Sequence, residues 1–171
     1  MTAIDEDYTT DVNLRGSAEA AFDALTTTDG LAAWWTEVTG VGTRGGELRF
    51  TFGDNARGLT IMRVDVAEPG LVEWTCLSSQ AATDWTGTTL SFALAPRPGG
   101  GCDLAFRHHG LTPKLECYLD CKSGWDHFIP SLQAFVDTGV GNPRDSDADR
   151  ARREVHSQRQ AAEAGVARSA E

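Results

Sequence analysis

The sequence lacks the signatures of several enzyme classes. It contains no phosphate-binding P-loop, no dinucleotide-binding strand–loop–helix unit and no nucleophile elbow. Its glycine clusters fall between apolar strand patterns, where they favour turns. We therefore expect no nucleotide cofactor, and the catalytic residues, if there are any, stay unknown.

Long apolar runs are also missing. No stretch approaches the roughly 20 apolar residues that span a bilayer. The first ten residues, MTAIDEDYTT, are acidic and do not resemble a secretory signal. We therefore expect a cytoplasmic protein, whose four cysteines would be reduced thiols.

Basic residues are scarce relative to acidic ones. The net charge is −10, all of it carried by residues 1–137, whereas residues 138–171 are neutral as a group. Such a domain repels phosphate backbones and anionic bilayers. We expect no nucleic acid and no membrane among its partners.

Large apolar rings, by contrast, are abundant. The 171 residues include five Trp and seven Phe, and 40 % of the chain is hydrophobic. This length suits one domain with a single core or an internal cavity.

Apolar spacing predicts the elements before residue 110. Period two over 8–14 predicts a strand, and Ser17 is a suitable cap for a helix that runs to about Thr27. Asp29 is the expected cap of a second short helix over 30–35. Alternating apolar and polar residues from 37 to 109 then predict a series of strands. Their short turns favour antiparallel neighbours.

A helix is expected to follow, beginning between Pro113 and Gly124 and ending near Asp137, with Gly139 as its stop signal. Apolar residues three or four apart give it one face that can cover the sheet. Pro130 lies inside it and predicts a kink. We place a domain at residues 1–140. Residues 141–171 contain no aromatic ring and are expected to form a mobile charged tail, disordered or marginally helical.

Several short motifs resemble those of a known superfamily. They are the pair Trp34–Trp35, the strand ending in His108-His109-Gly110-Leu111, and Gly124-Trp125 followed by Ser131-Leu132. Together they resemble the START-like (SRPBCC) proteins, most closely the branch of heat-shock-protein-90 ATPase activator homologues, over about residues 9–138. The resemblance implies an α+β helix-grip fold. In this fold a curved antiparallel sheet of six or seven strands wraps around a long C-terminal helix, with two short helices after the first strand.

The resemblance also implies a cavity between sheet and helix. We predict that a small, largely apolar ligand of unknown identity binds there, because ligand pockets combine apolar walls with a few polar groups. A core filled by rings is the alternative. The predicted cavity residues are Trp34, Trp35, Phe50, Phe52, Met62, Trp74, Phe92, Phe106, His108, Trp125, Phe128 and Leu132.

Two other functions stay open at this stage. The first is a cyclase-type or hydrolase-type enzyme with His108 or His127 as its acid/base group. The second is a chaperone-related interaction protein. His108 could equally be a buried histidine held by hydrogen bonds.

Other features are weaker. Cys117 and Cys121 are four residues apart, which is a thin basis for a metal site, and we predict none. Trp85 could cover a cavity mouth or simply contribute to the core. A monomer and a homodimer are both compatible with the sequence.

Overall fold

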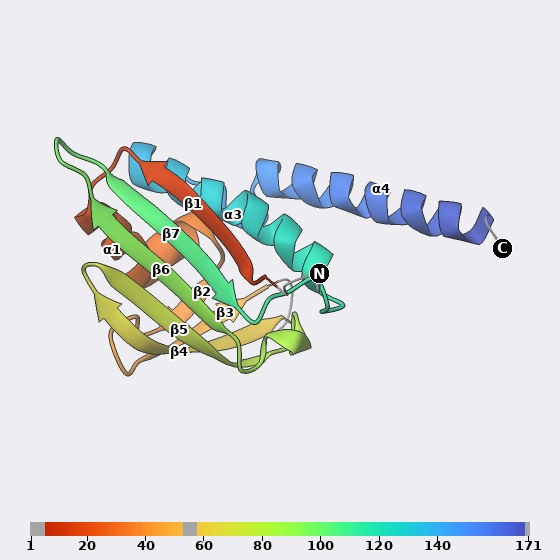
Figure 1. The fold of residues 1–171 in the computed structure, drawn as a ribbon, viewed down its shortest axis with the longest axis horizontal. Helices are drawn as coiled ribbons and strands as arrows, with labels where there is room; N and C mark the ends of the chain where they lie inside the picture. Colours follow the sequence, from red (N-terminus) through yellow and green to blue (C-terminus); the bar gives the residue numbers. More distant parts are fainter. Residues whose placement is uncertain (1–5, 53–57, 170–171) are drawn as a thin grey trace.

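The computed structural model describes residues 6–52 and 58–169. The predicted turn at 53–58 and the acidic start of the chain therefore lie mostly outside the described residues. The elements, shown in Figure 1, are β1 (Tyr8–Leu14), α1 (Ala18–Thr26), α2 (Thr28–Trp34), β2 (Val38–Gly40), β3 (Glu47–Thr51), β4 (Leu59–Glu68), β5 (Leu71–Ser79), the 3₁₀ turn η1 (Thr83–Trp85), β6 (Thr89–Pro96), β7 (Cys102–His109), α3 (Tyr118–Thr138) and α4 (Asp147–Ser169).

The seven strands form one antiparallel sheet in the order β1-β7-β6-β5-β4-β3-β2. This confirms the predicted helix-grip architecture. The pairing of β4 with β5 shifts register twice, at Ile61/Met62 and at Val64/Val66. Such bulges bend a strand and increase its twist, which helps the sheet to curve. Gly40–Gly45 has the spacing G-x-G-x-x-G, but it joins β2 to β3 with no helix after it, so it is a strand connection.

The two short helices follow β1 as predicted, although one cap differs. Ser17 caps α1 by accepting a hydrogen bond from the backbone N–H of Ala20. The second helix begins earlier than expected, because Thr27 rather than Asp29 is its cap. The Thr27 hydroxyl accepts from the backbone N–H of Gly30, and Asp29 lies in the first turn instead.

The long helix α3 begins and ends inside the predicted limits. Gly139 adopts a left-handed backbone with φ of 85° and closes the helix through a bond from its N–H to the Phe135 carbonyl. Pro130 does lie inside the helix, and the kink there stays a prediction. The same end of the helix holds the β1–α1 turn, since Asp137 accepts from the backbone N–H groups of Arg15 and Gly16.

The chain after residue 140 is more ordered in structure than its composition predicts. Residues 147–169 form one helix, α4, whose far end extends away from the sheet in Figure 1. Its first turns contact α3 through polar groups: Arg152 donates to the Ser123 hydroxyl, and His156 hydrogen-bonds to Asp120. These polar contacts were not predicted, because the segment has no apolar stripe adequate for docking. The domain boundary at residue 140 stays a prediction.

The close approach of the β1–α1 turn to the end of α3 can be tested by substitution. A Cβ added at Gly16 would lie 2.5 Å from both the Cγ1 and the carbonyl oxygen of Val136, whereas one added at Gly124 would meet only Phe128 at 4.0 Å. We expect Gly16→Ala to lower the free energy of unfolding by about 2 kcal/mol. The matched change Gly124→Ala should leave it unchanged or raise it by up to about 1 kcal/mol. Denaturant unfolding of both variants checks this, and an equal effect would contradict the close contact.

Candidate functional site

Most of the predicted cavity is filled by side chains. Aromatic rings from the sheet meet α2 and α3 in a continuous cluster: Trp35 lies 4.4 Å from Phe50, 5.1 Å from Trp125 and 6.3 Å from Trp74, measured between ring centroids. Eight of the predicted cavity residues are buried in this core and are not part of the lining of the pocket described below. They are Trp34, Phe50, Met62, Trp74, Phe92, Phe106, His108 and Leu132.

His108 has no exposed surface, and both of its ring nitrogens are bonded. The indole N–H of Trp125 donates to Nδ1 at 3.1 Å. Nδ1 is therefore the acceptor, so the proton of the neutral ring lies on Nε2. Nε2 then donates to the hydroxyl of Thr88 at 2.8 Å, and that hydroxyl donates to the Trp85 carbonyl at 2.6 Å.

The charge state of His108 follows from this burial. Desolvation is the main cause that lowers its pKa, from 6.5 to about 3. The charge of Asp7 acts to raise this pKa, and that of His109 acts to lower it. A neutral ring with two occupied nitrogens has no free site for a substrate proton. The arrangement therefore fits the buried, hydrogen-bonded alternative and does not support an acid/base role.

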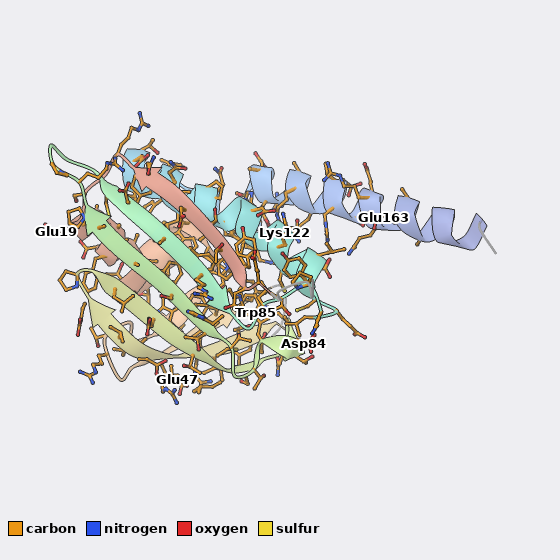
Figure 2. The ribbon with its side chains drawn as sticks, in the orientation of Figure 1. Glu19, Glu47, Asp84, Trp85, Lys122 and Glu163 are labelled. Carbon is orange, nitrogen blue, oxygen red and sulfur yellow. The ribbon has the colours of Figure 1, made fainter. Side chains whose placement is uncertain are left out.

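A pocket does exist, but at one end of the sheet. It has a volume of about 270 Å³ and lies where the ends of β4 and β5, η1, α3 and the first turns of α4 meet. Four predicted cavity residues line it, namely Trp35, Phe52, Trp125 and Phe128. Figure 2 labels Trp85, which also lines the pocket and stacks on Trp125 at 5.8 Å between centroids.

The wall formed by the sheet and η1 combines these rings with buried polar atoms. The hydroxyls of Thr60 and Ser79 are 2.8 Å apart, and Ser79 also accepts from the backbone N–H of Ala82. The indole N–H of Trp85 donates to the Cys121 sulfur at 3.0 Å. Apolar rings with a few placed polar groups are the usual composition of a small-molecule site.

The opposite wall is basic and comes from the chain after α3. Arg144, Arg152, Arg153 and His156 line it. Asp149, which is fully buried, accepts from Arg152 at 2.7 Å and lies 3.0 Å from Nε of Arg153. Burial alone would raise the pKa of Asp149. The pKa is nevertheless held below its ordinary value, because Asp149 accepts hydrogen bonds from Arg152 and from the backbone N–H of Asp145 and lies close to two arginine charges.

None of the four residues of this basic wall is among the predicted cavity residues. Its residues lie in the segment that was set aside as a charged tail, and nothing in the local pattern says where that segment folds back. The one available signal was the spacing of Asp149 with Arg152 and Arg153, which are three and four residues away on a helix.

The remaining candidates from the sequence are His127 and the pair Cys117 and Cys121. His127 hydrogen-bonds through Nε2 to the Asn142 carbonyl and does not line the pocket. Cys117 and Cys121 are free thiols, and burial raises the pKa of both. Within residues 6–52 and 58–169, no three His, Cys, Asp or Glu residues are grouped to hold a metal ion.

Known proteins resemble the chain in both sequence and fold. Residues 15–137 match the family described as "Activator of Hsp90 ATPase homolog 1-like protein". The chain belongs to this family. The matched segment holds six of the seven strands, β2 to β7, and all of α3 except its last residue, whereas β1 precedes it and the basic wall of the pocket follows it. No curated protein is similar enough to the chain to count as a relative.

Solved structures support the family's fold. The Aha1 dimer from Colwellia psychrerythraea is 27 % identical, with a TM-score of 0.68, over 80 % of this chain and 99 % of that one. CalU16 from Micromonospora echinospora is 16 % identical, with a TM-score of 0.61, over 90 % and 85 %. DynU16, from the dynemicin biosynthetic locus, is 19 % identical, with a TM-score of 0.60, over 80 % of this chain and 49 % of that one. The last two show the fold alone. Among the described helices, none has the length and apolar character needed to cross a bilayer.

The buried state of His108 predicts a specific loss of stability in acid. Its pKa is depressed on folding, so the unfolded chain binds a proton between about pH 6.5 and pH 3 that the folded chain does not. The free energy of unfolding therefore keeps its full value above pH 6.5 and decreases as the pH falls. We expect His108 to lower it by about 3 kcal/mol between pH 7 and pH 4. Chemical unfolding at both pH values should show this decrease.

Two substitutions assign that loss. His108→Gln should remove most of the decrease between the two pH values, whatever its effect on stability at pH 7. His109→Gln changes a partly exposed histidine on the other face and should retain the decrease. An unchanged decrease in His108→Gln would contradict the assignment.

The buried ion pairs of Asp149 predict that this residue stabilises the first turns of α4. Breaking a buried ion pair from one side leaves its partners unpaired and is strongly destabilising. We expect Asp149→Ala to increase amide hydrogen exchange in the first turns of α4 by about tenfold or more. Asp147→Ala, at an exposed position in the same turn, should have little effect. Equal exchange in the two variants would mean that the ion pairs do not dock the helix.

Proposed function

We propose that this protein binds a small, largely apolar molecule in the pocket between the end of the sheet, α3 and the start of α4. The observation that carries the proposal is the pocket itself: about 270 Å³ lined by five aromatic rings, with hydroxyl and basic groups at its edges. The volume lies just below the usual range for ligand sites, so the ligand must be small. The proposed site overlaps the predicted one in part, since Trp35, Phe52, Trp125 and Phe128 line this pocket.

The family and its fold support a binding role without naming the ligand. The eight core residues and twelve of the sixteen residues that line the pocket lie within the matched segment. An acid/base role for His108 loses its main support, because both ring nitrogens are bonded within the core. Interaction with a chaperone rests on the family description alone, so we propose binding in preference to it.

The test is native mass spectrometry of the protein after incubation with a small-molecule extract of its source cells. We expect a reproducible added mass. Ala82→Phe should abolish it, because Ala82 lines the pocket and a larger ring there fills the space without removing a core contact. Ala95→Phe places the same ring at an exposed position on β6 and should leave the added mass unchanged. An adduct that persists in Ala82→Phe would place the ligand elsewhere, and no adduct with any extract would count against binding.

A further inference from the structure

One cation in the pocket wall has no acidic partner. Arg152 and Arg153 both form ion pairs with Asp149, and Arg153 also pairs with Asp145. Arg144 differs from them, because no carboxylate among residues 6–52 and 58–169 forms an ion pair with it. Nε of Arg144 and Nε of Arg153 are both buried without a hydrogen-bond partner, but Nε of Arg153 lies 3.0 Å from the Asp149 carboxylate. The basic wall therefore carries one positive charge that the described residues leave unpaired.

The position of Arg144 is held by its backbone. Its N–H donates to the Trp35 carbonyl at 2.7 Å, next to the ring of Trp35 in the pocket. Two residues earlier, the N–H of Asn142 donates to the Ser131 hydroxyl, which itself donates to the Trp34 carbonyl. These bonds join the segment to α2 and α3, so Arg144 is placed at the pocket by the fold.

The side chain of Arg144 lies over an apolar surface. Its guanidinium carbon is 5.8 Å from the centroid of the Phe52 ring, and both residues line the pocket. Burial is the largest influence on the pKa of Arg144 and lowers it together with the charge of Arg153, whereas the charges of Asp149 and Asp145 act in the opposite direction. A buried charge is costly unless a group of opposite charge pairs with it.

We propose that the ligand is an aromatic or similarly apolar carboxylate whose head group binds Arg144 while its body contacts the rings of the pocket. The inference rests on the proposed function, since it names the class of ligand for the same pocket. A guanidinium presents paired donors that match a carboxylate. One unpaired cation suits a monoanion, and a dianion would leave a negative charge in a protein whose net charge is already −10. Arg144 lies outside the segment matched by the family model.

The test compares two probes with the same ring system, 2-naphthoic acid and 2-naphthamide. Binding is followed by the indole N–H signals of the five Trp residues in a ¹H–¹⁵N spectrum. Signals of Trp35, Trp85 and Trp125, which line the pocket, should shift more than those of Trp34 and Trp74, which do not. The acid should bind about tenfold to a hundredfold more tightly than the amide at neutral pH.

Variants at Arg144 assign the preference. Arg144→Gln should remove the preference for the acid, because it lowers the affinity for 2-naphthoic acid and leaves the affinity for 2-naphthamide unchanged. Arg144→Lys, which keeps the charge but loses the paired donors, should retain part of it. Arg150→Gln, at an exposed position on α4, is the matched control and should retain all of it. Unshifted Trp34 and Trp74 signals in each free variant show that the core is intact.

The outcomes separate the two proposals. Equal affinities for acid and amide at the pocket would overturn the carboxylate inference while leaving apolar binding in place. A preference for the acid that survives in Arg144→Gln would overturn the assignment to this residue. Failure of both probes would overturn the inference for aromatic carboxylates, and the extract experiment then decides the binding function separately.

Discussion

The hydrogen bond from the Trp125 indole to His108 joins the long helix to the sheet at the centre of the core. It requires a neutral histidine whose other nitrogen is a donor, and Thr88 supplies the acceptor. Both ring nitrogens of His108 and the indole N–H of Trp125 therefore have hydrogen-bond partners within the core. Trp125 also touches Trp35, Phe106 and Trp85, so one helix residue sets the spacing of rings from several elements.

The pocket lies at the edge of the fold, because large rings are packed together at its centre. Trp85, on the turn η1, stacks on Trp125 and donates to Cys121, and its ring forms the boundary between the packed core and the pocket. The helix-grip architecture does not by itself guarantee a central cavity. In this chain the number of large rings decides the matter, because five Trp and most of the Phe residues fill the concave side of the sheet.

The segment after α3 completes the pocket by polar means. Ser131 accepts the Asn142 N–H and donates to the Trp34 carbonyl, so one hydroxyl links two helices and the loop. Asp149 then pairs with two arginines at the start of α4, and one of them, Arg152, donates to Ser123 of α3. The segment matched by the family model thus supplies the five Trp and Phe rings of the pocket, and the residues after it supply the arginines.

Periodicity in the sequence determined the order and type of the elements, because residues that repeat at two or at 3.6 positions must share a face wherever the chain goes. It also placed the aromatic residues on the inner face, and the family motifs in their order identified the fold. Only the tertiary structure decided whether those rings enclose a space, since that depends on volumes summed over many elements. The meeting of Arg144 with Phe52, 92 positions apart in the chain, likewise depends on sheet curvature and on hydrogen bonds of the backbone, which no local pattern records.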